Sequence, residues 1–281
     1  MKHPYFAKEV LIATMHKKEL VIQDIFEKKI GCNIILPENF NTDVFGTFSG
    51  EITRKYSAYE TLKLKAIKAS EYFNKDYVIS SEGSFGPHPY FFFTADTEML
   101  LFYDRIKQLF IAEYEISMDT NFAEFKINKD NFKNDEYYKW LDHVKFPSHG
   151  LILKIDNSQI FKGITSHFEL EKLISSSLNK TEAMRLETDM RAMMNPTRMN
   201  VIKALTEKLS NRVLQVCDVC GSPGFGEVKY SGNLECEMCH QKTKTPKYKD
   251  FCCIKCDYKI INLIDSSKEF SDPTYCEFCN P

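Results

Sequence analysis

The sequence predicts an α/β fold, a mixed sheet flanked by helices, followed by a separate C-terminal module built on cysteines. Over roughly the first 210 of the 281 residues, short β-type runs alternate with segments of helical periodicity, as in a sheet covered by helices. In the remaining residues, eight of the ten cysteines of the chain form four Cys-x-x-Cys pairs. We therefore expect an α/β core over residues 1–212 and a module over residues 213–281.

The composition agrees with an ordinary globular core and with a reducing compartment. Hydrophobic residues make up 43% and charged residues 27% of the chain, which is usual for a globular protein. No run approaches the roughly 18 apolar residues of a membrane span, and the N-terminus lacks the apolar segment of a secretory signal. The sequence therefore favours a cytoplasmic protein with no membrane contact, whose cysteine pairs are metal thiolates and not disulfides.

The first elements alternate between strand and helix. Val10 to Ala13 is a short apolar run, and a helical pattern with Thr14 as N-cap extends to about Lys29. Asn33 to Leu36 has the composition of a second strand, and Phe45 to Ile52 alternates weakly, which is typical of a strand or hairpin arm.

The next segments include a well-marked helix and a hairpin. Ser57-Ala-Tyr-Glu60 is a capping box that opens a helix to about Asn74. Tyr77 to Ser80 resembles a buried strand that enters a Gly/Pro-rich loop, Glu82 to Pro89. Leu100 to Tyr103 and Phe110 to Ile116 predict two strands around a turn.

The rest of the core continues this alternation. We expect helices within Asn134 to Val144, Ile164 to Leu178 and Pro196 to Asn211. Gly150 to Ile155 and Leu186 to Thr188 have the composition of strands.

The cysteine pairs predict two structural zinc ions, because two pairs of thiolates complete one tetrahedral site. The pairs are Cys217/Cys220, Cys236/Cys239, Cys253/Cys256 and Cys276/Cys279. Sequential pairing gives spacings of 15 and 19 residues between the pairs that share an ion, both suitable for a double zinc ribbon. We favour this arrangement; a cross-brace, in which the first pair joins the third and the second joins the fourth, is also geometrically possible.

Three further residues lie outside these four-thiolate sets. Cys252 adjoins Cys253 and is a candidate substitute ligand, whereas Cys32 is most simply a core residue. His240 follows Cys239, but four thiolates already fill that site. Closed sites leave no open position for catalysis, so any chemistry belongs to the first 210 residues.

The charge of the module argues against nucleic acid as its main partner. Residues 213–281 carry eight Lys and no Arg against ten Asp and Glu, whereas a nucleic-acid site normally has a basic surface. One local exception is a loop between the second and third pairs with Lys242, Lys244, Lys247 and Lys249. We favour a solvated charged loop here.

Cations at two predicted helix starts indicate anion binding. The predicted helix after Thr14 begins with His16, Lys17 and Lys18, although the positive end of the helix dipole disfavours cations there unless an anion binds. Similarly, Asn195-Pro-Thr-Arg198 opens the last helix with Asn195 as N-cap, and Arg191 lies just upstream. Side chains that point into solvent explain the first case equally well, and ion pairs of the arginines with Glu187 or Asp189 explain the second.

A lysine and a carboxylate complete the candidate site. Lys65 is the lysine nearest the apolar stripe of its helix, so it is placed to lean over the edge of the core, although a surface lysine is the simpler alternative. Glu82 ends an apolar strand, where open α/β sheets bind ligands, and a carboxylate there suits Mg²⁺ beside substrate phosphates. A surface acid in a tight turn is the alternative.

Several motifs are spread over nearly the whole chain. They are Phe45-Gly-Thr-Phe-Ser-Gly-Glu51, Ser81-Glu-Gly-Ser-Phe-Gly-Pro-His-Pro89, Phe146-Pro-Ser-His-Gly150, Glu187-Thr-Asp-Met-Arg191, Asn195-Pro-Thr-Arg-Met199 and Cys279-Asn-Pro281. Together they resemble an uncharacterised family of bacterial proteins known only as a domain of unknown function. That resemblance implies no activity.

A more distant resemblance does imply one. In order, the chain has Ala13-Thr14 before Lys17 or Lys18, Glu60 with Lys65-Ala66, Glu82-Gly83, a hairpin over Leu100 to Ile116, and Asn195 to Arg198. This series is similar to the inosine triphosphatase and Maf superfamily of nucleoside triphosphatases. The chain departs from it at His16, where the superfamily has Asn, and at Pro196-Thr-Arg198, which replaces a Ser-His-Arg motif.

The resemblance implies a metal-dependent nucleoside triphosphate pyrophosphatase. Glu82 would hold Mg²⁺, and Glu60 would be a second ligand or base. The phosphates would be bound by Thr14, Lys17, Lys65, Arg191 and Arg198. The alternative is a non-catalytic nucleotide- or RNA-binding protein whose zinc module contacts RNA or a protein partner, and the module is also compatible with a purely structural or oligomerising role.

Overall fold

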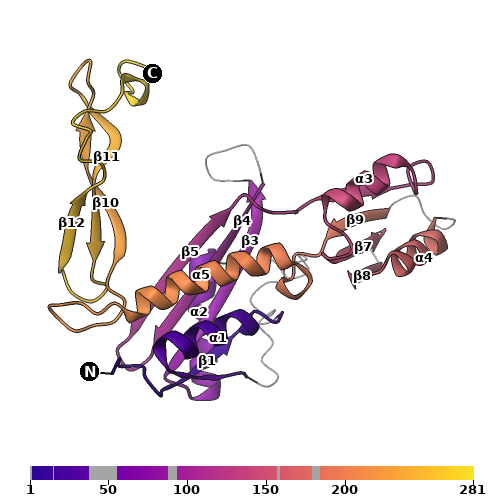
Figure 1. The fold of residues 1–281 in the computed structure, drawn as a ribbon, viewed down its shortest axis with the longest axis horizontal. Helices are drawn as coiled ribbons and strands as arrows, with labels where there is room; N and C mark the ends of the chain where they lie inside the picture. The colour runs from indigo at the N-terminus through magenta and orange to yellow at the C-terminus, as the bar shows by residue number, and fades with distance from the viewer. Residues whose placement is uncertain (1, 15, 38–55, 88–93, 157–158, 179–183) are drawn as a thin grey trace.

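The computed structural model describes residues 2–14, 16–37, 56–87, 94–156, 159–178 and 184–281. Three parts lie in a row, a central α/β unit between a smaller α/β unit and the cysteine module (Figure 1). Helix α5 (Pro196–Leu214) crosses the central unit, beginning near the smaller unit and ending at the module. The predicted boundary at residue 212 therefore falls in the last turn of this helix.

The central unit contains a five-stranded mixed sheet with the order β2-β1-β3-β4-β5. Strand β1 pairs in parallel with β2 and β3, whereas β3, β4 and β5 are antiparallel neighbours. The strands are β1 (Glu9–Ala13), β2 (Asn33–Ile35), β3 (Tyr77–Pro87), β4 (Thr94–Asp104) and β5 (Leu109–Ser117). A mixed sheet flanked by helices is thus confirmed.

Helices cover both faces of this sheet. Helices α1 (Glu19–Ile30) and α5 pack on one face, where Ile12 and Phe102 belong to the same buried cluster. Helix α2 (Ala58–Phe73) packs on the other face against residues such as Leu101. Because side chains alternate between the faces of a strand, each central strand contributes to both clusters.

The smaller unit contains a second sheet, of antiparallel strands in the order β6-β9-β7-β8, covered by two helices. Its strands are β6 (Glu124–Ile127), β7 (Leu151–Ile155), β8 (Gln159–Ile164) and β9 (Met184–Thr188), and its helices are α3 (Asp135–His143) and α4 (His167–Ser177). The sequence did not predict β6 or β8. Strand β6 has only four residues, and most residues of β8 are exposed or half-buried. Neither segment therefore contains the apolar run from which a strand is predicted.

Two chain segments join these units, one after β5 and one after β9, and buried polar groups hold them. Asn195 Nδ2 donates to Asn121 Oδ1 at 2.8 Å, and His149 Nε2 lies 2.9 Å from Thr197 Oγ1. A 3₁₀ turn, η2 (Ala192–Met194), precedes α5 in the second segment. Because buried polar groups need specific partners, these bonds fix where α5 begins.

The cysteine module is a three-stranded antiparallel sheet in the order β10-β11-β12. Its strands are β10 (Glu227–Glu235), β11 (Lys242–Cys252) and β12 (Lys259–Leu263), and a 3₁₀ turn, η3 (Pro273–Tyr275), lies near the C-terminus. The segment predicted as a lysine-rich loop is strand β11. Strand β11 pairs with β10 on one side and with β12 on the other, and a count of charges in the sequence does not indicate such pairing.

Two other local predictions were wrong. Thr14 is not the N-cap of α1: His16 and Lys17 adopt positive φ values of 67° and 60°, and the helix begins at Glu19 with Lys18 as N-cap. Strand β3 continues through the predicted Gly/Pro-rich loop to Pro87, because β4 pairs with it over its whole length. The segments with Phe45 to Ile52 and His88 lie outside the described residues.

Candidate functional site

The candidate site lies where β1 ends and β3 continues. The last paired residues of these strands are Ala13 and Ser80. From Ser81 to Pro87, β3 pairs with β4, and no strand of the described residues lies along its other edge. Side chains on both faces of this part of β3 therefore lie beyond the carboxyl end of β1, and open α/β sheets bind ligands at the carboxyl ends of their strands.

Glu98 of β4 is the centre of a buried ion-pair group. Its carboxylate lies 2.5 Å from Arg198 Nε and 3.4 Å from Lys18 Nζ. The Glu98 side chain is 1% exposed. Burial acts to raise the pKa of Glu98, but the charges of Arg198 and Lys18 outweigh it and hold that pKa below its usual value. Burial lowers the pKa of Lys18 to about 8.

Asp96 lies two residues before Glu98 and on the same face of β4. It is buried, and its Oδ1 has no hydrogen-bond partner among the residues that the structure describes. Burial, together with the negative charge of Glu98, raises the pKa of Asp96 to about 7. A carboxyl group with this pKa gains and loses a proton near neutral pH.

Helix α5 delivers Arg198 to this group. Asn195 caps the helix, with its Oδ1 accepting a hydrogen bond from the Arg198 backbone N–H at 3.0 Å. The guanidinium donates to the Met190 carbonyl oxygen and lies 5.0 Å from the centre of the Phe85 ring. Gly83 makes this approach possible, because a Cβ at that position would collide with the guanidinium and with Glu98.

A second ion pair lies on the α2 face of β3, between Lys65 and Glu82, and both side chains are buried. At the end of β1, Thr14 Oγ1 lies 2.7 Å from Ser81 Oγ. The charges of Lys65 and Glu82 both act on the Lys18 ammonium, so the two faces share one electrostatic environment. We name the six ionisable residues of both faces the charge cluster: Lys18, Lys65, Glu82, Asp96, Glu98 and Arg198.

Three predicted site residues lie elsewhere. Lys17 is exposed, and its neighbour Lys18 occupies the buried position. Glu60 is exposed and completes the predicted capping box, in which it accepts hydrogen bonds from the Ser57 N–H and hydroxyl. Arg191 forms an ion pair with the buried Asp189 at 2.6 Å, which agrees with the structural alternative for that residue.

The sequence motifs gave Lys18 only as an alternative to Lys17, and we did not predict Asp96 or Glu98 as members of the cluster. A signal was present for the two acids: two carboxylates spaced by two residues precede the apolar run of β4, so they share the face of Leu100 and Phe102. Charged side chains in line with a buried stripe need partners.

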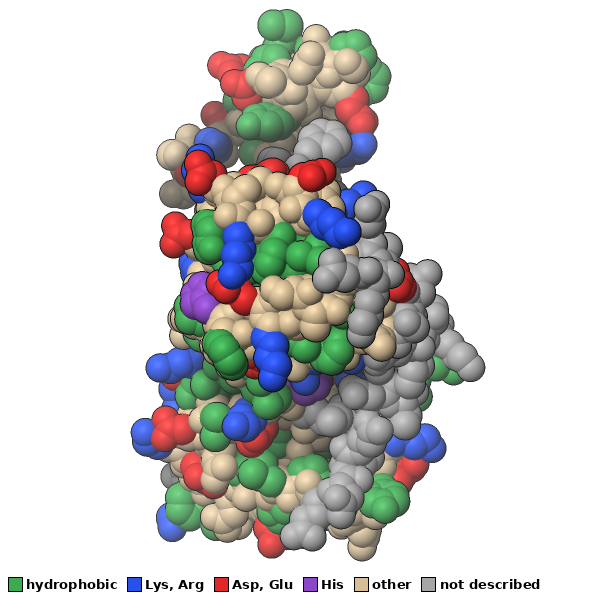
Figure 2. Space-filling model, turned by 90° about the vertical axis from the view of Figure 1, so that its right-hand side faces the viewer, with side chains coloured by type: hydrophobic (Ala, Val, Ile, Leu, Met, Phe, Trp, Pro, Cys, Tyr) green, Lys and Arg blue, Asp and Glu red, His purple; other side chains and the backbone are tan. Residues whose placement is uncertain are grey.

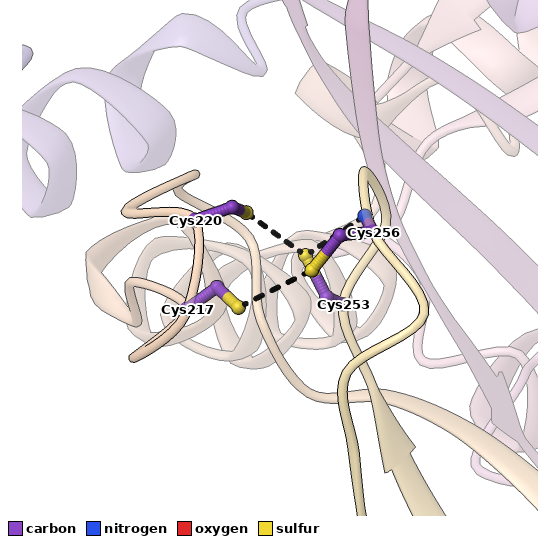
Figure 3. A group of neighbouring side chains, drawn as sticks. All are labelled: Cys217, Cys220, Cys253 and Cys256. Atoms are coloured by element: carbon purple, nitrogen blue, oxygen red, sulfur yellow. Dashed lines mark hydrogen bonds between the residues drawn. The ribbon is translucent and has the colours of Figure 1, made fainter.

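The cysteine pairs form two groups of four, and the preferred sequential pairing was wrong. The first group is Cys217, Cys220, Cys253 and Cys256, and the second is Cys236, Cys239, Cys276 and Cys279. Figure 3 shows the sulfur atoms of the first group pointing toward one another from two separate loops. The first pair thus joins the third and the second joins the fourth.

The topology of the module explains this cross-brace. Strand β10 carries the chain from one end of the module to the other, β11 returns it, and β12 crosses again. The first and third pairs therefore meet at the end near α5, and the second and fourth meet at the far end (Figure 1). The sequence spacings could not reveal this, because they do not say whether the intervening residues return to the same end.

Both groups fit a tetrahedral zinc ion. Four sulfur atoms at about 2.3 Å from zinc lie about 3.8 Å apart. The distances between sulfur atoms of different pairs agree with this value. They are 3.8 Å for Cys217–Cys256 and 3.7 Å for Cys220–Cys253 in the first group. In the second group they are 3.9 Å for Cys236–Cys279 and 3.5 Å for Cys239–Cys276. Cys252 and His240 belong to neither group, and Cys32 is a buried core residue. Among the described residues, no carboxylates form a comparably tight set.

On the face that Figure 2 shows, the Lys, Arg, Asp and Glu side chains of the described residues are interspersed. No helix in the described ranges is long and apolar enough to cross a membrane. A cytoplasmic location stays a prediction.

Comparisons with known proteins identify the family. No curated protein and no solved structure matches the chain, so the likeness to the inosine triphosphatase and Maf superfamily rests on the motifs alone. The model of the domain of unknown function DUF6671 matches residues 65–281, which include both cysteine groups and every member of the charge cluster except Lys18. Because this match covers more than half of the chain, the protein belongs to the DUF6671 family.

Proposed function

We propose that the charge cluster binds the phosphates of a nucleoside triphosphate and that the protein hydrolyses them with Mg²⁺. The observation that carries the proposal is the burial of three cations and three carboxylates at the carboxyl end of β1. Ion pairs at this depth rarely stabilise a fold more than apolar side chains of the same volume would. Binding of a ligand that needs both positive and negative side chains, such as a phosphate with its metal ion, accounts for a buried cluster that stability alone does not explain.

The cations and hydroxyls account for phosphate binding. Lys18, Lys65 and Arg198 would neutralise the phosphate charges, and Thr14 would donate a hydrogen bond. Arg198 suits this role because a guanidinium binds two phosphate oxygens at once. Its backbone position at the start of α5 adds the positive end of the helix dipole.

The three carboxylates have three different roles. Glu82 would hold Mg²⁺ together with the phosphate oxygens, and this ion needs only one or two protein carboxylates when a phosphate supplies the rest. When bound, Mg²⁺ polarises the phosphoryl oxygens. Asp96 would accept the proton of the water whose oxygen forms the new bond to phosphorus, because its pKa of about 7 matches neutral pH. The bond from that phosphorus to its bridging oxygen would break, and the leaving group would depart with the electron pair, as pyrophosphate or as the nucleoside diphosphate. Glu98 would position Arg198 and Lys18. Glu60 has no part in this scheme, since its carboxylate caps α2.

The test is the release of phosphate and pyrophosphate from a panel of nucleoside triphosphates by the zinc-loaded full chain with Mg²⁺. We expect turnover that falls by about 100-fold or more in Asp96→Asn and in Glu82→Gln. The matched control, Glu60→Gln, keeps the capping box and should retain full turnover. Wild-type protein without turnover of any nucleotide contradicts hydrolysis, and equal losses in all three variants contradict the assigned roles.

One observation favours non-catalytic RNA binding as a second candidate. A cavity of about 690 Å³ lies between the central unit and the module, lined in part by Tyr59, Phe110, Tyr230, Lys208 and Lys249. Aromatic rings and lysines are the groups that stack on bases and bind phosphates in single strands. RNA binding that weakens steeply with salt and is lost in Lys208→Ala and Lys249→Ala would support it, whereas RNA binding unaffected by either substitution would remove it.

A further inference from the structure

Strand β12 presents an apolar free edge at the side of the module. All five of its residues are exposed, and Ile264 continues the run. The exposed fractions are 39% for Ile260, 49% for Ile261, 50% for Leu263 and 46% for Ile264. An edge strand of this kind readily pairs with another strand. We name residues 259–265 the edge segment.

The hydrogen bonds to β11 determine which backbone groups of the edge segment face outward. Ile264 N–H donates to the Lys247 carbonyl oxygen, and Cys253 N–H donates to that of Tyr258. Since hydrogen-bonded and non-hydrogen-bonded pairs alternate along antiparallel strands, the even-numbered residues bond to β11. The N–H and C=O groups of Lys259, Ile261 and Leu263 therefore point away from the sheet.

The opposite edge of the same sheet is protected in a way that β12 is not. Strand β10 has charged residues at Glu227 and Lys229, a glycine at Gly232 with φ of 61°, and a register shift after Asn233. Charges, glycines and bulges on an edge strand discourage pairing with another chain. The interior of the edge segment contains none of these features.

We propose that two copies of the chain associate through β12, pairing the edge segments antiparallel about a twofold axis at Asn262. The segment Lys-Ile-Ile-Asn-Leu-Ile-Asp is complementary to itself in this register. Its cross-strand pairs are Lys259 with Asp265, Ile260 with Ile264, and Ile261 with Leu263 of the second copy.

The backbone accepts the same register. Ile261 and Leu263 both carry outward N–H and C=O groups, so they exchange hydrogen bonds across the axis. Moving the axis by half a residue step pairs outward groups with inward ones, and moving it by a whole step sets Lys259 or Asp265 against an apolar side chain. The register at Asn262 therefore satisfies charge, apolar contact and hydrogen bonding together, and two modules form one six-stranded sheet.

Charge reversal on separate copies tests this arrangement. Lys259→Glu sets two acids against each other in its own dimer, and Asp265→Lys sets two lysines against each other. A mixed dimer of the two variants has only opposite charges at these positions. By sedimentation of the zinc-loaded full chain, we expect a wild-type dimer, a dissociation constant at least about tenfold higher for each variant alone, and restoration near the wild-type value on mixing.

Two controls separate pairing from damage to the fold. Lys229→Glu makes the same charge change on β10 and should leave the dimer intact, and zinc content should stay at two ions per chain in every variant. Lys259 also lies 3.4 Å from Asp250, so Asn262→Asp, which puts two carboxylates at the axis without touching that contact, should weaken the dimer as well. A monomeric wild type, a dimer indifferent to Asn262→Asp and Asp265→Lys, or variants that do not recover on mixing would each overturn the proposal.

Discussion

Glu98 carries its charge in a setting where an unpaired carboxylate would be strongly unfavourable. Ion pairs with Arg198 and Lys18 stabilise that charge. Asp96 lies on the same face of the strand, and its raised pKa makes it the carboxyl group that takes up a proton. One strand thus holds two carboxyl groups whose pKa values are displaced in opposite directions. Such a pair is typical of sites that transfer protons.

Gly83 is the residue on which the position of Arg198 depends most directly. Replacing it with Ala brings a Cβ against the guanidinium and Glu98, so Gly83→Ala should lower the free energy of unfolding by about 1 to 3 kcal/mol and impair nucleotide binding. Gly86→Ala in the same strand is the matched control, because its Cβ meets nothing within 4 Å. Chemical denaturation and titration with nucleotide compare the two, and equal behaviour would show that this close contact does not matter.

The raised pKa of Asp96 predicts that the stability of the fold decreases as pH rises. Between its unfolded value of 3.8 and its folded value of about 7, the folded chain keeps a proton that the unfolded chain loses, so the stability contributed at Asp96 falls as pH rises. Above pH 7 this loss is complete. Asp96→Asn has no such loss and should be more stable than wild type at pH 8, by about 1 to 4 kcal/mol, while losing turnover.

Denaturation of both proteins from pH 5.5 to 8.5 provides the measurement. The advantage of Asp96→Asn should grow up to about pH 7 and then level off. A difference that does not change with pH would mean that Asp96 is ionised throughout this range.

Residue patterns predicted some of these positions and not others. Asn195 and Ser57 were predicted as helix caps, because capping depends on a few neighbouring residues. Lys18 was not separated from Lys17, because the choice depends on two left-handed residues that rotate the chain between β1 and α1. Arg198, the partner of Glu98 on α5, is 100 residues away from it in the sequence, and no local sequence pattern indicates this contact.

At the level of elements, helix α5 links all three parts. Its first turn holds Arg198 in the charge cluster, its middle packs on β4, β5 and α1, and its last residue lies three positions before Cys217. The periodicity of the sequence predicted this helix and the central strands. Strands β6 and β8 were missed because they form by pairing with β9 and β7, and their own residues show no clear strand pattern. Strand β3 was predicted too short for the same reason.

The cap of α5 should matter more to the site than an equivalent cap elsewhere. Asn195→Ala removes the bond to the Arg198 N–H and leaves the Asn121 Oδ1 without the donor Asn195 Nδ2, so we expect a loss of about 1 to 2 kcal/mol together with weaker nucleotide binding. Asn134→Ala removes the corresponding cap of α3, whose Oδ1 accepts from Tyr137 N–H at 2.9 Å. Calorimetry should show destabilisation in both variants and weaker nucleotide binding only in the first.

At the scale of the whole molecule, the cross-brace makes the module a single unit with a four-cysteine group that fits zinc at each end. Zinc binding at four thiolates contributes on the order of 10 kcal/mol to folding such a module. The number and type of the sites were predictable from cysteine spacing, but their pairing depends on the number of times the chain crosses the module.

Zinc counting distinguishes the two pairings. Cys217→Ser with Cys253→Ser damages one site of the cross-brace, so one zinc ion per chain should remain, whereas sequential pairing would leave none. Cys217→Ser with Cys236→Ser reverses the expectation: the cross-brace loses both ions and sequential pairing keeps one. Metal analysis of the purified double variants gives the count.

The most direct test of the phosphate site compares two adjacent lysines. Affinity for a nucleoside triphosphate with Mg²⁺ is measured by calorimetric titration of wild type, Lys18→Ala and Lys17→Ala. Because Lys18 is buried beside Glu98 and Lys17 is exposed, we predict at least about tenfold weaker binding for Lys18→Ala and no change for Lys17→Ala. Equal effects of the two substitutions, or a wild type that binds no triphosphate, would contradict a phosphate site at the charge cluster.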